Sequence, residues 1–175
     1  LLVHREIAGA FLPQIKAVLE EKGVDIRGCE ETRKLIDVIP ATAEDWRTEY
    51  LDLILSVKVV AGLEEAITHI NHYGSGHTDV IVTADRGRGA RFMDTVDAAD
   101  VFLNCSSRFS DGFRYGLGAE VGISTSKIHA RGPVGMEGLV IYKWRLIGNG
   151  HIAADYAGAD AKPFNHRPLQ KTFGG

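Results

Sequence analysis

The chain has 175 residues, of which 45% are hydrophobic and 25% charged, and its formal net charge is -3 at pH 7. This is ordinary globular composition, and a chain of this length can bury about 70% of its unfolded surface around one core. The charge does not indicate nucleic acid or an anionic membrane as a partner, and no apolar run approaches the roughly 18 residues that a membrane span needs. Cys29 and Cys105 are too few for a disulfide framework, and they fit a reducing, cytoplasmic compartment.

The first part of the chain alternates apolar runs with helical patterns. Residues 1–4 form an apolar run, which we interpret as a buried strand at the start of a fragment of a longer protein. Residues 7–22 place apolar side chains near a 3.6-residue period, which predicts a helix with Gly23 as its C-cap. Residues 24–27 are typical of a second strand, whereas residues 30–36 are ambiguous.

The middle of the chain continues the alternation. Residues 53–60 (LILSVKVV) give the clearest strand pattern, and residues 63–73 place their apolar side chains on one helical face. A strand over 80–83, a helix over 90–98 and a strand over 101–104 follow. Strands that alternate with helices predict βαβ units, a mainly parallel sheet and the α/β fold class.

The C-terminal part differs in pattern. Residues 139–147 (LVIYKWRLI) predict one long strand with no hairpin partner nearby, and the polar tail after Gly148 is aperiodic. Such a strand exposes an unpaired edge that another chain can cover. We therefore expect a domain over 1–138, an oligomerisation strand over 139–150 and a C-terminal tail over 151–175.

Several motifs are weak candidates for chemistry. Gly116, Gly118 and Gly122 have the spacing G-x-G-x-x-x-G, which departs from the dinucleotide fingerprint G-x-G-x-x-G. Cys29 lies beside two glutamates that disfavour a thiolate, so it is a poor candidate nucleophile. Cys105 follows an expected strand, and we interpret it as a small buried thiol.

Three histidines fall close together at His69, His72 and His77. Histidines three residues apart can share a helix face and bind a metal ion, but no cysteine or acidic ligand accompanies these in a recognised pattern. We therefore expect polar residues on a helix surface and at a helix end, and no metal site.

A glycine-rich stretch over 111–135 follows a cluster of polar residues. Glycine lets backbone approach a ligand closely and lets N–H groups converge, and Arg108 is suited to bind a carboxylate or a phosphate in a forked geometry. A long ordered turn that only connects the sheet to the last strand is the alternative. The polar residues before the stretch are Asn104, Ser106, Ser107, Arg108, Ser110 and Asp111.

Three long stretches carry a resemblance to a known family: residues 60–81 (VAGLEEAITHINHYGSGHTDVI), 101–112 (VFLNCSSRFSDG) and 116–135 (GLGAEVGISTSKIHARGPVG). The last two resemble the C-terminal signature, and the first resembles a second signature, of the gamma-glutamyl phosphate reductases, also called glutamate-5-semialdehyde dehydrogenases, of the aldehyde dehydrogenase superfamily. The likeness is closest to the fungal-type monofunctional enzymes, and it extends to the reductase half of the pyrroline-carboxylate synthases. Cys105 departs from the family, which more often has alanine there.

The resemblance implies an aldehyde-dehydrogenase-like catalytic domain with three layers, α/β/α, and a C-terminal interface strand. It implies reduction of L-glutamyl 5-phosphate with NADPH to glutamate 5-semialdehyde and phosphate, the second step of proline biosynthesis. In the family a cysteine thiolate attacks the acyl phosphate, and hydride then reduces the thioester. That cysteine lies in a motif immediately before the segment that here begins at Leu1, so we expect no catalytic nucleophile in this chain.

Site roles are carried over by position. Glu49 matches the superfamily glutamate that holds the nicotinamide ribose, although a surface glutamate is the alternative. Gly118 and Glu120 match a Gly-x-Glu that shapes a loop. The expected substrate-binding residues are Ser106, Ser107, Arg108, Phe109 and Asp111.

The resemblance also implies a homodimer, or a multiple of one, through residues 139–147. Two alternatives stay open. The chain is a fragment competent only for dimerisation, or it belongs to an aldehyde dehydrogenase with another substrate. The stretches 106–111 and 129–133 speak against the second alternative.

Overall fold

A computed structural model describes residues 1–127 and 129–168 of the chain. It divides into two units, Leu1–Val140 and Ile141–Gly175, which are described separately below. Within the described residues, no helix is both long enough and apolar enough to cross a membrane.

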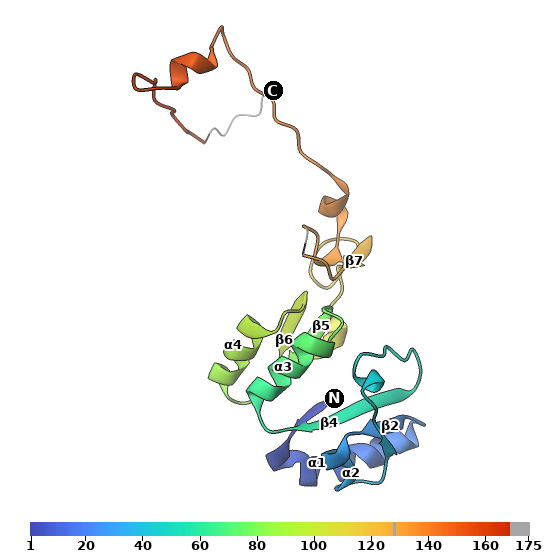
Figure 1. The fold of residues 1–175 in the computed structure, drawn as a ribbon. Coiled ribbons are helices and arrows are strands. Elements are labelled where there is room, and N and C mark those ends of the chain that lie inside the picture. The colour runs from blue at the N-terminus through green and yellow to red at the C-terminus, as the bar shows by residue number, and fades with distance from the viewer. Residues whose placement is uncertain (128, 169–175) are drawn as a thin grey trace. The chain divides into compact units, whose positions relative to one another are not determined.

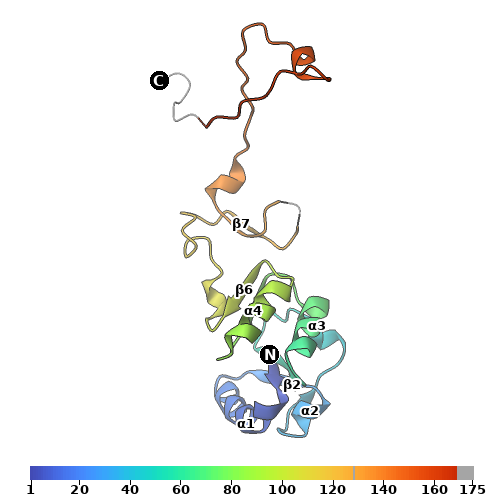
Figure 2. The same ribbon diagram turned by 90° about the vertical axis from the view of Figure 1, so that its left-hand side faces the viewer.

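A four-stranded parallel sheet with the order β1-β4-β2-β3 dominates the first half of the larger unit (Figure 1). Strand β4 lies inside the sheet, with β1 on one side and β2 on the other. Figures 1 and 2 both show α1 and α2 on the same side of this sheet. The elements are β1 (Leu2–His4), α1 (Arg5–Glu21), β2 (Asp25–Gly28), α2 (Glu30–Arg33), β3 (Ile39–Pro40) and β4 (Ile54–Val60).

Local chemistry fixes the ends of α1. The His4 side chain accepts a hydrogen bond from the Glu6 backbone N–H, and Gly23 adopts a φ of +68° just after the helix. Its apolar face covers the sheet. The core there consists of Val3, Ala8, Leu12, Ile26, Ile36 and Val57.

A second parallel pair of strands follows, with its own core. The elements are α3 (Leu63–Tyr73), β5 (Thr78–Ile81), α4 (Arg86–Thr95) and β6 (Asp100–Leu103). Ile67, Phe92, Val96 and Ala98 form the buried cluster beneath the two helices. Asp85 caps α4 by accepting the Arg88 N–H at 3.0 Å.

The described residues of the glycine-rich stretch are mostly irregular. The 3-10 helix η2 (Ser107–Phe109) precedes the stretch, which contains an antiparallel hairpin of β7 (Gly122–Ser124) and β8 (Gly132–Val134). The guanidinium of Arg131 bonds the Asp97 carboxylate at 3.0 Å, and Lys127 pairs with the same carboxylate. These contacts attach the hairpin to the segment between α4 and β6.

The expected α/β class and the mainly parallel pairing are confirmed, although the strands of the described residues form three separate sheets. Several predicted boundaries shift. Among them, β5 begins at Thr78 rather than at residue 80, and α4 begins at Arg86 rather than at residue 90. The cap at Asp85 explains the earlier start of α4, because it lets two glycines stand in the first turns.

The strand predicted over 139–147 does not form in this structure, so that prediction is wrong for the single chain. The 3-10 helix η3 (Met136–Leu139) occupies its start, and residues 140–147 carry no ladder hydrogen bonds. A strand needs a neighbour to satisfy its backbone groups, and no strand of this chain pairs with this segment within the described residues. Farther along, the smaller unit contains the 3-10 helix η4 (Ala153–Tyr156), where the Tyr156 ring stacks on Phe164 at 5.2 Å.

Candidate functional site

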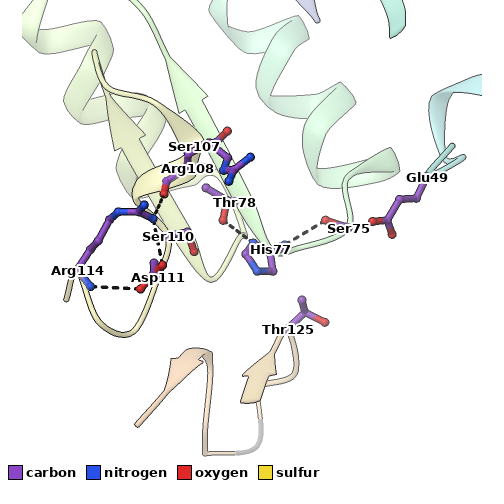
Figure 3. Close-up of a pocket in the computed structure, with 10 residues that line it drawn as sticks. All are labelled: Glu49, Ser75, His77, Thr78, Ser107, Arg108, Ser110, Asp111, Arg114 and Thr125. Carbon is purple, nitrogen blue, oxygen red and sulfur yellow. Dashed lines mark hydrogen bonds and ion pairs between the residues drawn. The ribbon is translucent and has the colours of Figure 1, made fainter. Parts of the chain in front are cut away.

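A polar cavity of about 750 Å³ lies in the larger unit beside the residues that begin β5 (Figure 3). Segments that are far apart in the sequence contribute to it: the segment after η1 (Glu44–Trp46), the end of the α3–β5 connection, the loop after β6, and the β7–β8 hairpin. It is lined by Glu49, Ser75, His77, Thr78, Ser107, Arg108, Ser110, Asp111, Arg114 and Thr125.

The loop after β6 folds back along the sheet to form one wall. Asn104 starts the reversal with a φ of +55°, and its side-chain amide bonds both the N–H and the C=O of Thr83, each at 2.8 Å. The loop is then held near the start of β6, because the Ser110 hydroxyl donates to the Asp100 carboxylate at 2.8 Å. The Tyr115 hydroxyl donates to the same carboxylate at 2.7 Å, and burial together with this bond raises the pKa of Tyr115 to about 12. The cavity therefore lies at the amino ends of β5 and β6, although Arg108 follows a carboxyl end.

Two of the four charged groups in the cavity wall neutralise each other. The Arg114 guanidinium bonds the Asp111 carboxylate at 3.1 Å and the Arg108 carbonyl at 2.5 Å. Asp111 also accepts the Phe113 backbone N–H at 2.8 Å. Asp111 thus shapes the loop that presents Arg108.

The other two charged groups are unpaired. Neither the Arg108 guanidinium nor the Glu49 carboxylate has a hydrogen-bond or ion-pair partner within residues 1–127 and 129–168. A free guanidinium suits a carboxylate or a phosphate, and a free carboxylate suits hydroxyl donors. The cavity can therefore bind a ligand that carries both kinds of group.

Hydroxyl and imidazole groups form another part of the wall. The Nδ1 atom of His77 hydrogen-bonds the Thr78 hydroxyl, and the His77 backbone N–H donates to the Ser75 hydroxyl at 3.3 Å. In the described part of the chain no contact engages the Nε2 atom of His77, so this nitrogen is available to a ligand. Figure 3 shows Thr78 beside Arg108, and Ser75 between His77 and Glu49.

The structure brings four of the six predicted site residues together. Glu49, Ser107, Arg108 and Asp111 line the cavity. Ser106 and Phe109 are not part of its lining: the Ser106 hydroxyl caps η2 by accepting the Arg108 N–H at 3.2 Å, and the Phe109 side chain is 53% exposed.

Other cavity residues were missed by the sequence analysis. His77 was expected at a helix end without a ligand role, and only its place inside the stretch 60–81 could have drawn attention to it. Among the described residues no cluster of three metal-ligating side chains exists, and His69 packs edge-on against Trp46 with ring centroids 5.5 Å apart. The missed lining residues are Ser75, His77, Thr78, Arg114 and Thr125, whereas Ser110 belongs to the polar cluster that the sequence analysis named.

The other motifs take structural positions. Glu120 accepts the Gly112 N–H at 2.8 Å across the loop, which agrees with a loop-shaping role. Gly116 and Gly118 adopt φ values of +77° and +74° in turns that open no helix, unlike a dinucleotide-binding loop.

Neither cysteine lines the cavity, and both are free thiols. The expectation that two glutamates raise the pKa of Cys29 is wrong. Burial does raise it, but hydrogen bonds from the Thr32 hydroxyl and from neighbouring backbone N–H groups outweigh burial and lower the pKa. Cys105 is exposed, so the expectation of a buried thiol is also wrong.

A second, more apolar cavity of about 660 Å³ lies between β1 and β5. Strand β1 pairs only with β4, and β5 pairs only with β6, so each has a free edge among the described residues. The lining of this second cavity includes Val3, Val60, Ile81 and Phe92.

Comparison with known proteins gives a consistent result at high identity. No protein-family model matches the chain. Gamma-glutamyl phosphate reductase of Pelotomaculum thermopropionicum is 67% identical over 174 residues, which are 99% of this chain and 40% of that protein. The enzyme of the same name from Acetivibrio thermocellus is 64% identical over 173 residues, again 99% of this chain and 40% of that protein. The chain thus spans about two fifths of the length of these curated relatives.

A solved structure shows the same fold. The crystal structure of gamma-glutamyl phosphate reductase from Thermotoga maritima superposes with a TM-score of 0.82 at 50% sequence identity, covering 86% of this chain and 37% of that protein. The fold of this chain is therefore the fold of the corresponding part of that enzyme.

Proposed function

We propose that this chain is part of a gamma-glutamyl phosphate reductase, which reduces L-glutamyl 5-phosphate to L-glutamate 5-semialdehyde and phosphate in proline biosynthesis. The observation that carries the proposal is 67% identity to such an enzyme over 174 residues. The cavity supports it independently, because its free charges match a substrate with anionic ends and a cofactor with ribose hydroxyls.

Substrate binding is assigned to the loop after β6. L-glutamyl 5-phosphate carries a carboxylate and a phosphate, and Arg108 offers an unpaired guanidinium for one of them. The Ser107 and Ser110 hydroxyls line the same wall, and the free Nε2 of His77 adds a further hydrogen-bonding group. Ser106 and Phe109 act indirectly, by forming the turn that presents Arg108.

Binding of the nicotinamide ribose is assigned to Glu49. Its carboxylate is exposed and unpaired, so it can accept both hydroxyl protons of a nicotinamide ribose. We propose NADPH as the cofactor, in keeping with the family resemblance, and it would supply the hydride when bound. No phosphate-recognising motif in this chain binds its remaining groups, so we assign them to the rest of the enzyme.

The covalent chemistry requires a thiolate close to the acyl carbon. A cysteine thiolate in the remaining part of the enzyme would displace phosphate from the acyl phosphate and form a thioester. The bound cofactor would supply the hydride that reduces this thioester, so that the semialdehyde leaves and the thiolate is restored. Arg108 of this chain binds one of the two anionic groups of the substrate. Neither Cys29 nor Cys105 lines the cavity, which supports a nucleophile in the remaining part of the enzyme.

We further propose that residues 139–147 mediate assembly of a homodimer or a multiple of one. Ile141 is 98% exposed, Tyr142 and Trp144 are each 82% exposed, and Leu146 is 88% exposed. Apolar side chains of this size are rarely left in water together, and backbone groups without ladder bonds suit pairing with another subunit.

A cytoplasmic location accords with the two free thiols. The narrower likeness to fungal-type enzymes or to a pyrroline-carboxylate synthase stays a prediction.

The test is a substrate panel with the purified full-length enzyme that contains this sequence. Oxidation of NADPH with L-glutamyl 5-phosphate, and reduction of NADP⁺ with the semialdehyde and phosphate, are followed by nicotinamide absorbance. We expect activity that depends on phosphate in the reverse direction. Preference for an aldehyde without an amino acid group, independent of phosphate, would support an ordinary aldehyde dehydrogenase, and dimers without any turnover would support an assembly module.

A further inference from the structure

A buried carboxylate lies at the base of the segment that carries Glu49. Asp45 belongs to η1 and is only 5% exposed, whereas Glu49, in the same segment, is exposed and lines the cavity. We propose that Asp45 and Tyr50 are positioning residues, whose mutual hydrogen bond fixes the backbone on both sides of Glu49 and so orients its carboxylate for the cofactor. This inference rests on the cofactor role proposed above for Glu49.

The Asp45 carboxylate joins three segments of the chain. Its Oδ1 atom accepts hydrogen bonds from Arg27 Nη1 on β2 and from the Tyr50 hydroxyl, both at 2.6 Å. Its Oδ2 atom accepts the backbone N–H of Thr42 at 2.6 Å and the Thr42 hydroxyl at 2.8 Å. Residues before η1 and after Glu49 are thereby tied to one buried point.

Tyr50, the residue that follows Glu49, is held at both its hydroxyl and its ring. The hydroxyl lies 2.7 Å from the Ser56 hydroxyl on β4, and Ser56 in turn donates to the Asp45 carbonyl at 3.0 Å. The Arg27 guanidinium lies 5.0 Å from the centroid of the Tyr50 ring. Tyr50 therefore cannot move without breaking contacts to both β2 and β4.

The backbone immediately after Tyr50 is also constrained. Leu51 has a φ of +53°, a left-handed conformation that is costly for a residue with a branched side chain. Its side chain is 90% exposed, so its own packing does not impose this conformation. Leu51 lies between Tyr50, whose hydroxyl is hydrogen-bonded to Asp45, and β4, which begins at Ile54.

Glu49 has no such anchors of its own. Among the described residues its carboxylate has no partner, so the direction in which it points is inherited from its neighbours in the chain. A group that is oriented before the ligand arrives loses less conformational freedom on binding. The buried cluster thus supports cofactor affinity without touching the cofactor.

The charge on Asp45 is stable. Hydrogen bonds from the Tyr50 hydroxyl, the Thr42 N–H and the Arg27 guanidinium hold the pKa of Asp45 well below its usual range. The carboxylate therefore remains an acceptor at any neutral pH. Tyr50→Phe removes one donor but keeps the ring and the Arg27–Asp45 ion pair, so it perturbs the cluster less than any change of Asp45.

The experiment uses the full-length enzyme with Tyr50→Phe, Glu49→Gln and the double variant. Tyr73→Phe on α3 is the matched control, since no hydrogen bond of its hydroxyl is part of the cluster. The Kd of NADPH is measured by fluorescence titration, KM of the acyl phosphate by steady-state kinetics, and the melting temperature by calorimetry. Ser56→Ala repeats the test at a second point of the cluster.

We expect Tyr50→Phe to raise the Kd of NADPH about three- to tenfold, the loss that follows from one hydrogen bond, with KM of the acyl phosphate within about twofold. In the Glu49→Gln background the same change should leave the Kd of NADPH unaltered, because the group that it orients is no longer a carboxylate. A lower melting temperature with unchanged Kd, or an effect of Tyr50→Phe that persists at full size without the Glu49 carboxylate, would overturn the positioning role. If Glu49→Gln itself leaves the Kd unchanged, the cofactor role of Glu49 is wrong and the positioning role is wrong with it.

Discussion

The Ser110 hydroxyl donates a hydrogen bond to the Asp100 carboxylate at 2.8 Å, and this bond brings the loop that follows β6 back to the residue at which β6 begins. Tyr115 donates to the other oxygen of the same carboxylate at 2.7 Å. Asp100 is 9% exposed, so both bonds are sheltered from water. Arg108 lies on this loop, so its position in the cavity depends on the two hydrogen bonds that hold the loop to Asp100.

Asp100→Ala should therefore impair substrate binding without touching the substrate. Two sheltered hydroxyl groups lose their acceptor, which costs about 1–3 kcal/mol of folding free energy and releases the Arg108 loop. We expect a higher KM for L-glutamyl 5-phosphate and a lower unfolding free energy by urea titration, with the Kd of NADPH changed less. The exposed Asp94→Ala on α4 is the control. An unchanged KM would show that the loop is held by other contacts.

Arg108→Ala should weaken use of the acyl phosphate much more than binding of NADPH. The guanidinium is unpaired in the described part of the chain, so its loss removes a ligand contact and leaves no partner unsatisfied. A charge-assisted hydrogen bond contributes about 1.5–3 kcal/mol, so kcat/KM should fall about tenfold or more. Arg91→Ala, which breaks a surface pair with Glu64, is the matched control. Equal kcat/KM values for Arg108→Ala and the native enzyme would remove Arg108 from the site.

The sequence predicted the regular elements better than the site. Apolar periodicity located α1, β4 and α3 closely, because burial of one face decides those elements. The same periodicity placed the start of α4 too late. The first turns of α4 hold Gly87 and Gly89, which give no apolar pattern, and the start of the helix is marked by the cap at Asp85.

Cavity residues depend on contacts between distant segments. His77 and Arg108 line the same cavity, and the Ser110–Asp100 hydrogen bond that holds the Arg108 loop there is not encoded by any local sequence pattern. The cluster around Asp45 is likewise assembled from β2, β4 and the segment between them. Family resemblance pointed to Glu49, whereas physical reasoning on the sequence alone had already pointed to Arg108 as a forked cation in a polar loop.

Acid should destabilise the protein through His69. Burial, followed by the nearby Lys58, lowers the pKa of His69 from 6.5 to about 4 in the folded state. As pH falls below 6.5 the unfolded chain binds this proton first, so the contribution to stability is complete above pH 6.5 and is lost progressively toward pH 4. His69→Phe keeps a ring against Trp46 and should flatten the fall of melting temperature across this range. The exposed His151→Phe is the control, and identical slopes for native protein and His69→Phe would contradict the assignment.

Proline at Val140 and Tyr142 should prevent assembly of the full-length enzyme. Each proline removes a backbone donor that a strand pairing between subunits would need. We expect monomer or aggregate by light scattering in place of a homodimer. Ala161→Pro, which lies outside residues 139–147, serves as the control. A double-proline variant that elutes as an intact dimer would exclude this segment from the interface.

The 175-residue chain by itself should show no reductase turnover. It spans about two fifths of the curated relatives, and neither of its thiols lines the cavity where the acyl carbon must lie. Holding a nucleophile, the acyl group and the nicotinamide in one geometry can contribute about 7–11 kcal/mol to lowering the barrier, and this contribution is lost when the nucleophile and most of the cofactor site are missing. The assay mixes the chain with NADPH and the acyl phosphate, or with NADP⁺, the semialdehyde and phosphate, and follows nicotinamide absorbance. Turnover that disappears in Cys105→Ser would place the nucleophile in this chain after all. We expect turnover only when the remaining part of the enzyme is present. We also expect that neither Cys29→Ser nor Cys105→Ser reduces this turnover.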